Sequence, residues 1–276
     1  MYGSILGDMI GSPYEFDQEN KTKDFPLFIP ASRFTDDSVM TVAITDALMY
    51  NWQEDDQTII RAVTAAMVKW GREYPHAGYG GRFAKWLFSP YRKPYNSYGN
   101  GSAMRVSSVS WFFDDLGEVM RAARLTAIVT HSHPEGIRGA QAAACAGFLA
   151  RTGAANDEIR EYITKTFGYR LDFTCDEIRP GYTFDVSCQG TVPQAITAFL
   201  EGKDFEDVVR TAASLGGDCD TLTCIAGGIA ECCYPVPEWM KEECRKRLYP
   251  DMLRVLDAFE DAMKEKKEKA YAGRKN

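Results

Sequence analysis

The sequence comprises 276 residues, of which 45% are hydrophobic and 26% are charged. This composition is typical of a globular protein that can bury a large core. The formal net charge of −7 leaves no basic excess to displace the counterions of nucleic acid, so we expect no stable nucleic-acid binding. The Lys- and Arg-rich residues 264–276 are the exception, and we interpret them as a solvated tail.

The N-terminal residues and the cysteines indicate a cytoplasmic protein. Asp8 interrupts the first apolar stretch, which also lacks a basic n-region, so this stretch does not resemble a signal peptide. No apolar run approaches the roughly 20 residues that a membrane span needs. The eight cysteines include no CxxC pair and no zinc-binding spacing, and we interpret the adjacent Cys232 and Cys233 as core residues. We therefore expect a reduced, cytoplasmic monomer that does not associate with membranes.

Apolar residues recur at three- and four-residue spacing along most of the chain, which predicts helices. The predicted helices cover residues 39–50, 57–70, 118–130, 136–152, 156–168, 191–202, 204–217, 220–233 and much of 236–270. Strand-like alternation is best at 182–188, and it is short. Residues 74–102 are dense in Gly, Pro and Tyr, and an irregular stretch of that length is usually functional. The sequence thus predicts a single all-α domain, residues 1–276, whose loops carry the site.

Two short acidic clusters each precede a predicted helix. The first is Thr35-Asp36-Asp37, within FTDDSVMTVA, and the second is Asp218-Cys219-Asp220-Thr221, after a Gly-Gly turn. Taken alone, each cluster is explained as a pair of helix caps that complement the helix dipole. Oxygen-only donors of this kind also suit a hard cation such as Mg²⁺, Ca²⁺ or Mn²⁺ rather than zinc.

Together, the two clusters are better explained as halves of one metal site. Four carboxylates a few ångströms apart carry a charge of −4, which costs several kcal/mol without compensation. Two divalent cations would supply the balancing charge. The competing EF-hand interpretation fails, because the fifth and twelfth positions counted from Asp218 hold Leu222 and Ile229. An aspartyl-phosphate enzyme is disfavoured because no buried strand precedes Asp218.

Three weaker elements could belong to the same site. Glu15 follows a turn that contains Gly and Pro, although a solvated glutamate would explain it equally well. The loop at 95–105 contains glycines whose backbone N–H groups could cradle phosphate oxygens. His131 and His133 could bind metal, but a hydrogen bond from His131 to a ligand is the preferred interpretation.

The order of these motifs resembles that of the ADP-ribosylglycohydrolase family, which includes the dinitrogenase-reductase-activating and ARH3-like enzymes. The matching motifs are GSILGDMIGSPYEF, FTDDSV, NSYGNGSAMR, the Thr-His pair of THSHPEGIRGA, and GGDCDT with its small-residue helix. They span residues 3 to about 231. The resemblance implies an all-α fold with a binuclear Mg²⁺ or Mn²⁺ centre at the bottom of a cleft.

The resemblance also implies roles for individual residues. The family's metal ligands fall on Thr35, Asp36, Asp37, Asp218, Asp220 and Thr221. Its ADP-ribose contacts fall on Gly80, Gly81, Ser97, Tyr98, Gly99, Asn100, Gly101 and His131. Its catalytic carboxylates fall on Glu15 and Asp218, either of which could act as the general base.

The sequence departs from the family pattern at three positions outside these sets. Ser38 stands where threonine is common and conserves the hydroxyl group. Ser108 replaces a frequent proline. Glu231 occupies a position that usually holds a small residue, so we expect an effect on local packing.

The function implied by the resemblance is hydrolysis of the glycosidic bond between ADP-ribose and a modified serine or arginine of a protein. Two alternatives share the same nucleotide pocket: hydrolysis of a small ADP-ribose conjugate, and binding of ADP-ribose without cleavage. The partner is accordingly an ADP-ribosylated protein or a small conjugate. We expect loops 16–33 and 74–96 to shape the mouth of the cleft, but their sequence does not reveal the acceptor.

Overall fold

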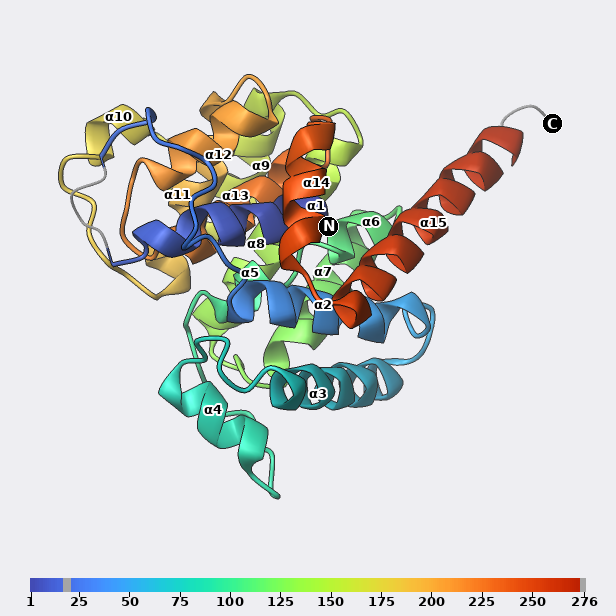
Figure 1. The fold of residues 1–276 in the computed structure, drawn as a ribbon. Coiled ribbons are helices and arrows are strands. Elements are labelled where there is room, and N and C mark those ends of the chain that lie inside the picture. Colours follow the sequence, from blue (N-terminus) through green and yellow to red (C-terminus); the bar gives the residue numbers. More distant parts are fainter. Residues whose placement is uncertain (17–20, 274–276) are drawn as a thin grey trace.

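The computed structural model describes residues 1–16 and 21–273, and these residues form helices and loops without any strand (Figure 1). The predicted all-α class is therefore confirmed. No helix in the described part of the chain combines the length and the apolar character of a membrane-spanning segment. The elements are α1 (Tyr2–Gly11), η1 (Ser12–Tyr14), α2 (Asp36–Met49), α3 (Asp56–Glu73), α4 (Gly81–Phe88), α5 (Gly101–Met104), α6 (Val109–Phe112), α7 (Leu116–Ile128), α8 (Pro134–Arg151), α9 (Asn156–Phe167), α10 (Cys175–Ile178), α11 (Cys188–Glu201), α12 (Phe205–Ala213), α13 (Cys219–Ala230), α14 (Glu238–Arg247) and α15 (Pro250–Gly273).

Helices α1 and α13 pack against each other in the middle of the molecule with almost no side chains between them (Figure 1). A Cβ atom on Gly7 would lie only 2.1 Å from the carbonyl oxygen of Thr223, and one on Gly3 would lie 2.1 Å from that of Gly227. The Thr223 hydroxyl donates to the carbonyl of Gly7 at 2.6 Å. The four-residue spacing of glycines places them on one helix face, and that face allows the two backbones to touch.

Glu231, one of the three departures from the family pattern, ties the end of α13 to the start of α1. Its carboxylate accepts hydrogen bonds from the backbone N–H groups of Tyr2 at 3.0 Å and Gly3 at 2.8 Å. The first N–H groups of a helix have no partner within the helix, and a negative charge there also complements the helix dipole. The expected effect on packing is therefore a cap that α13 provides for α1.

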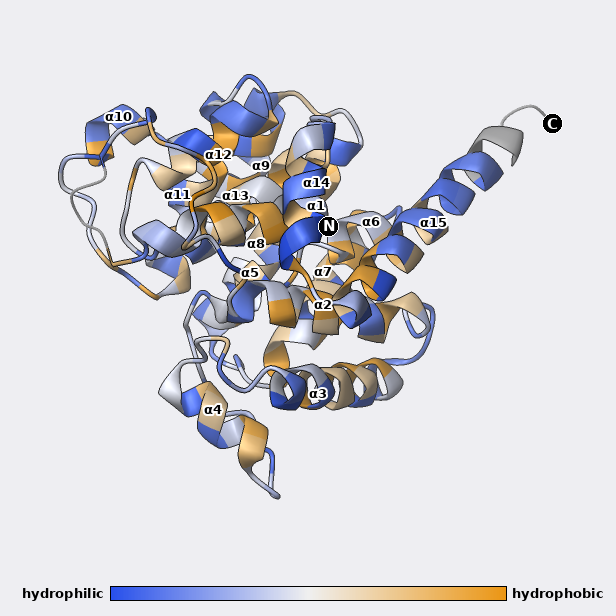
Figure 2. Ribbon diagram, viewed as in Figure 1, coloured by the Kyte–Doolittle hydropathy of each residue, from blue (hydrophilic) through white to orange (hydrophobic). Residues whose placement is uncertain are grey.

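The core surrounds this helix pair and extends as one cluster of buried apolar residues from Met1 to Phe259. Figure 2 shows apolar residues in the central helices and hydrophilic residues along the outer part of α15. Cys232 is buried, as expected, whereas Cys233 is exposed and does not belong to the core.

Several elements differ from the sequence-based expectation. Helix α1 was not predicted, because its glycines resemble a turn. Helix α4 lies within the stretch 74–102 that was expected to be irregular. Residues 182–188 form no strand; their only sheet-like contact is an isolated antiparallel bridge from Ser187 to Gly99. The helical region after residue 236 is two helices, because Pro250 begins α15 and disfavours helix at the residue before it.

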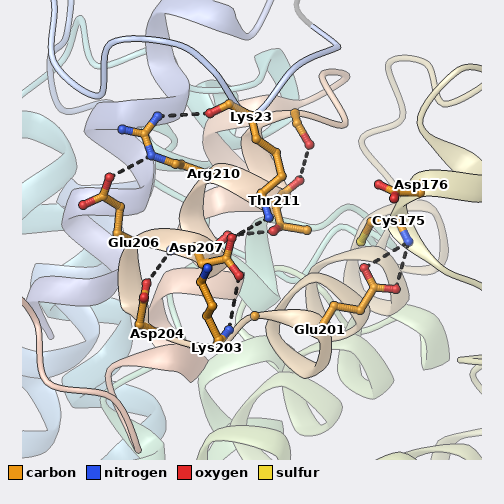
Figure 3. A network of polar contacts seen from close by, with 12 residues as sticks. Lys23, Cys175, Asp176, Glu201, Lys203, Asp204, Glu206, Asp207, Arg210 and Thr211 are labelled. Carbon is orange, nitrogen blue, oxygen red and sulfur yellow. Dashed lines mark hydrogen bonds and ion pairs between the residues drawn. The ribbon is translucent and has the colours of Figure 1, made fainter.

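Helix α12 anchors the segment that follows residue 20 (Figure 3). Lys23 forms an ion pair with Asp207 at 2.5 Å, and Arg210 donates to the carbonyls of Lys23 at 3.1 Å and Phe25 at 2.7 Å. The ammonium of Lys21 donates to the carbonyl of Leu215, in the turn between α12 and α13. These contacts hold the loop beside the start of α13.

We predict that Gly7→Ala will destabilise the protein by about 1–3 kcal/mol, because the added methyl group would overlap the backbone of Thr223. Chemical denaturation would measure this loss. Gly181→Ala is the matched control, since a Cβ there would meet no atom within 4 Å, and its stability should stay within about 0.5 kcal/mol of the wild type. Equal stability of the two variants would show that the α1–α13 contact is not a constraint.

Candidate metal centre and cleft

Helix α2 is capped by residues other than its two leading aspartates. Thr35 is the N-cap, and its hydroxyl accepts from the backbone N–H of Asp37 at 3.3 Å. The fully buried Asp8 of α1 accepts from the N–H and the hydroxyl of Thr35, at 2.8 and 2.7 Å, and from the N–H of Ser38 at 3.0 Å. The explanation of Asp36 and Asp37 as caps therefore fails, and both carboxylates remain available.

Asp8 is the main residue of this region whose role the sequence does not reveal. In the sequence it interrupts the apolar N-terminal stretch, within the motif GSILGDMIGSPYEF. The signal was its position one residue after Gly7, on a helix that could not be recognised from its sequence. The hydroxyl of Ser38 also hydrogen-bonds to Asp8. A side chain that holds both ends of the Thr35–Ser38 segment fixes where the two aspartates lie.

The second cluster begins where a tight turn meets α13. Gly216 and Gly217 adopt positive φ angles of 67° and 74°, a conformation that suits glycine. Asp218 is the N-cap of α13, but its side chain makes no capping hydrogen bond. Its Oδ2 instead accepts from the side-chain amide of Asn100 at 2.6 Å. Like the carboxylates of Asp36 and Asp37, the carboxylate of Asp218 does not cap the helix that it precedes.

The two clusters meet, as the sequence predicted. The hydroxyl of Thr221 donates to Oδ2 of Asp37 at 3.3 Å, which joins the starts of α13 and α2. Carboxylate oxygens of Glu15, Asp218 and Asp220 all lie within 4.8 Å of one another. Glu15 is half-buried, whereas the two aspartates are buried.

These side chains fit a hard divalent cation. Oδ1 of Asp37 is buried and has no hydrogen-bond partner, although buried polar atoms are normally satisfied. No ion pair within residues 1–16 and 21–273 joins a Lys or Arg to any carboxylate of the cluster. All donors in the cluster are oxygens, which Mg²⁺, Mn²⁺ and Ca²⁺ prefer. A cation would satisfy the orphaned oxygen and balance the charge.

Burial and mutual repulsion raise the pKa values of the cluster. Burial, followed by the negative charges of Asp218 and Asp8, raises the pKa of Glu15 to about 7, against the opposing effect of Arg33. Burial, followed chiefly by the charge of Asp8, raises the pKa of Asp36 to about 8. Burial likewise raises the pKa values of Asp37 and Asp220 well above their usual range. The cluster thus binds protons tightly when no cation is present.

The cluster lies along a cleft of about 440 Å³ that also contains most of the predicted substrate contacts. Two predicted residues do not line it. Thr35 is buried and donates its hydroxyl to Asp8, and the half-exposed Tyr98 packs its ring against His133 with centroids 5.4 Å apart. The predicted residues that line the cleft are Glu15, Asp36, Asp37, Gly80, Gly81, Ser97, Gly99, Asn100, Gly101, His131, Asp218, Asp220 and Thr221.

Other residues of the cleft were not predicted from the sequence. Phe16 and Phe184 line it, and their rings stack with centroids 6.0 Å apart. Arg82 and the fully buried Arg105 also line it. Gly80 and Gly81, which were expected in a loop, are the N-cap and first residue of α4. Single exposed aromatics and lone arginines carry no distinguishing pattern in one sequence.

The buried His131 is held by a chain of hydrogen bonds that begins at Arg105. Arg105 donates to the hydroxyl of Thr130 at 2.9 Å, and that hydroxyl lies 2.8 Å from Nδ1 of His131. Burial and the charges of Arg105 and Arg82 hold the pKa of His131 well below its usual range. The guanidinium charge favours the arrangement in which Thr130 donates to Nδ1. The proton of the neutral ring then resides on Nε2. This nitrogen lies beside Gly101, since a Cβ atom added to that glycine would be 3.3 Å from it.

We predict that the metal-free protein is more stable at pH 6 than at pH 8. A carboxyl group with a raised pKa binds more protons in the folded chain than in the unfolded chain, where its pKa is near 4. Between that value and about 7 for Glu15 or about 8 for Asp36, the free energy of unfolding therefore falls as pH rises. Calorimetry in EDTA should give a melting temperature several degrees higher at pH 6, at roughly 2–4 °C per kcal/mol.

Excess Mg²⁺ provides the control for this experiment, because a bound cation favours the ionised carboxylates. It should raise the melting temperature at pH 8 and reduce the difference between the two pH values. A melting temperature in EDTA that is higher at pH 8 than at pH 6 would contradict the raised pKa values.

We also predict that His131 stays neutral, with its proton on Nε2, between pH 6 and pH 8. The chain has 3 histidines, so long-range ¹H–¹⁵N NMR spectra can resolve the tautomer of each ring. Thr130→Val removes the hydroxyl that faces Nδ1 and should shift the His131 tautomer population without changing the spectrum of His76. A wild-type His131 that carries its proton on Nδ1, or that titrates near pH 6.5, would disprove this arrangement.

The family suggested by the motifs is borne out by comparison with known proteins. The chain matches the sequence model of the ADP-ribosylglycohydrolase family over residues 1–269. ADP-ribosylhydrolase ARH3 of Homo sapiens is 28% identical, over 91% of this chain and 89% of the human protein. ADP-ribosylarginine hydrolase Tri1 of Pseudomonas putida is 26% identical, over 88% of this chain and 72% of Tri1.

A solved structure described as an ADP-ribosylglycohydrolase-related protein complex has the same fold. It is 20% identical, and the alignment covers 94% of this chain and 95% of that chain with a TM-score of 0.63. The match over residues 1–269 identifies the chain as a member of the ADP-ribosylglycohydrolase family.

Proposed function

We propose that this protein is a metal-dependent hydrolase that cleaves the glycosidic bond between ADP-ribose and a modified protein side chain. The observation that carries the proposal is the orphaned buried Oδ1 of Asp37 within an all-oxygen carboxylate cluster at the cleft. The relatives named as ADP-ribosylhydrolases support the substrate class. One of them is named for arginine, so serine and arginine linkages are both candidates.

Two Mg²⁺ or Mn²⁺ ions would be held by Thr35, Asp36, Asp37, Asp218, Asp220 and Thr221. When bound, such ions act as Lewis acids that orient the substrate and lower the pKa of bound water. Thr35 is compatible with this role because its hydroxyl proton is donated to Asp8, so an oxygen lone pair remains for a cation. Asn100 orients the carboxylate of Asp218 through the hydrogen bond to Oδ2.

Carboxylates of the chain can accept the proton of the attacking water and stabilise the positive charge that develops on the sugar. Water attacks the anomeric carbon of the ribose, and the bond to the acceptor atom breaks with its electron pair passing to that atom. The proton of the water passes to a carboxylate, and the carboxylic acid so formed protonates the released side chain. Glu15 is the better candidate for this base, because it is half-buried at the cleft, whereas Asp218 already accepts from Asn100. The remaining carboxylates stabilise the positive charge that develops on the sugar.

The rest of the cleft would hold the ADP-ribose. The hydroxyl of Ser97 and the backbone N–H of Gly101, both at the cavity, can donate to phosphate oxygens. The N–H groups of Gly99 and Asn100 already donate to Oγ of Ser97 and to the carbonyl of Val186. His131 would add an Nε2–H donor. Gly80 and Gly81 begin α4, where the first N–H groups have no partner within the helix. Tyr98, although outside the cleft lining, exposes an aromatic ring on which a base could stack.

We predict release of ADP-ribose from at least one of two matched peptides, one ADP-ribosylated on serine and the other on arginine. Release should require Mg²⁺ or Mn²⁺ and stop in EDTA. Asp36→Asn should reduce kcat/KM by about 100-fold or more, because a proposed ligand loses its charge. Asp157→Asn, an exposed change at the start of α9, is the control and should retain wild-type activity.

The two variants should also be compared by circular dichroism and by calorimetric Mg²⁺ binding, so that a loss of fold is not mistaken for a loss of chemistry. Full activity of folded Asp36→Asn, or release that EDTA does not affect, would refute the metal-dependent mechanism. ADP-ribose binding without any release would instead indicate a binding protein.

A further inference from the structure

A second cavity lies beside the cleft and has no role in the proposed chemistry. It has a volume of about 720 Å³, which is within the range of roughly 300–1,000 Å³ that is common for ligand sites. It is formed by the segment before α2, the end of α3 with the residues that follow it, and the connection between α14 and α15 (Figure 1). We call it the Arg33 pocket; its lining includes Arg33, Phe34, His76, Lys246, Arg247 and Tyr249.

The Arg33 pocket is separated from the carboxylate cluster by a thin wall of backbone. Gly78 lines both cavities. The N–H of Asp36 donates to the carbonyl of Ala77 at 2.8 Å, and a Cβ on Gly78 would lie 3.3 Å from Oδ1 of Asp36. The pocket shares no residue with loop 97–101 and does not include His131. It therefore adjoins the cleft beside Asp36, and of the proposed nucleotide contacts only Gly80 and Gly81 follow closely on the shared Gly78.

The charge of the Arg33 pocket differs from that of the whole chain, which is −7. Arg33 forms no ion pair within the described residues, and its charge opposes the rise in the pKa of Glu15. Lys246 and Arg247 share a single carboxylate, that of Glu243, each at 2.6 Å. Glu73 is the only acidic side chain in the lining. Cationic groups thus outnumber the carboxylates that could neutralise them.

One wall of the pocket is aromatic. The rings of Phe34, Tyr74 and Tyr249 pack together with centroids 5.6–5.9 Å apart. The side chain of Tyr249 is nevertheless 58% exposed. A cationic rim over an exposed aromatic wall offers ion pairs to acidic side chains and apolar contact to the aliphatic parts of a peptide.

We propose that the Arg33 pocket binds the polypeptide segment next to the ADP-ribosylated side chain and favours acidic residues there. This inference rests on the proposed function. If ADP-ribose lies along the glycine loop and His131, with its bond to the acceptor at the carboxylates, the acceptor chain leaves the cleft at the carboxylate end. The Arg33 pocket is the described cavity that shares its wall with that end.

The test uses two ADP-ribosylated peptides with the same acceptor, one with acidic and one with basic flanking residues. The wild-type protein should have a higher kcat/KM for the acidic peptide, mainly through a lower KM. Lys246→Glu should reduce this preference by about three- to tenfold, as expected for reversal of one surface charge. Rising salt concentration should weaken the preference of the wild type.

Lys264→Glu on α15 is the matched control. Lys264 is exposed to a similar degree, 69% against 64% for Lys246, and pairs in the same i,i+3 way, with Asp261 at 3.6 Å rather than Glu243 at 2.6 Å. It does not line the pocket, so Lys264→Glu should leave the preference for acidic flanks unchanged. Lys246→Gln, which neutralises rather than reverses the charge, should give an intermediate effect.

The outcomes separate this inference from the proposed function. Equal kcat/KM values for the two peptides, or the same loss of preference in Lys264→Glu and Lys246→Glu, would overturn the role of the pocket while the hydrolase assignment stands. No release from either peptide or from a small ADP-ribose conjugate would instead remove the hydrolase assignment, and the docking role would fall with it.

Discussion

The direct contact between the backbones of α1 and α13 is the constraint on which the site depends. Glycines at the crossing let a carbonyl of one helix lie where a side chain of the other would normally be. Asp8 projects from α1 toward the start of α2, while α13 brings Asp218 and Asp220 to the same place. Helices α1 and α13, which are far apart in the sequence, thereby place their acidic residues beside Asp36 and Asp37 at the start of α2.

Within that volume the carboxylates divide into two kinds. Asp8 is fully buried, which raises its pKa to about 6, but hydrogen bonds from backbone and side-chain donors of Thr35 and Ser38 oppose that rise and occupy both of its oxygens. Asp37 is also buried, yet its Oδ1 has no partner. Leaving a buried acceptor unpaired is costly. We therefore assign Asp8 a structural role and Asp37 a role in binding a ligand.

The sequence predicts features that depend on residues close together in the chain. It does not predict features that depend on how distant helices pack. The spacing of oxygen donors around Asp36 and Asp220 was enough to predict that the two clusters meet. Asp8 could not be recognised, because its importance comes from a helix whose glycines make sense only against α13. Likewise, nothing near Arg105 in the sequence indicates that it reaches His131 through Thr130. Periodicity identified the amphipathic α3 but not α4, which is short and follows a run of glycines.

The charges of the cleft are arranged along its length, and this arrangement limits what it can bind. The carboxylates occupy one part, whereas Arg82 and Arg105 lie near enough to His131 to lower its pKa. Arg105 is buried with no carboxylate partner in the described chain; its Nη2 donates to Thr126 and Thr130, while its buried Nε has no hydrogen-bond partner. A ligand with phosphates at the arginine end and sugar hydroxyls at the carboxylate end would match this polarity. A uniformly anionic ligand would be repelled by the carboxylates, and a cationic one would leave the arginines uncompensated.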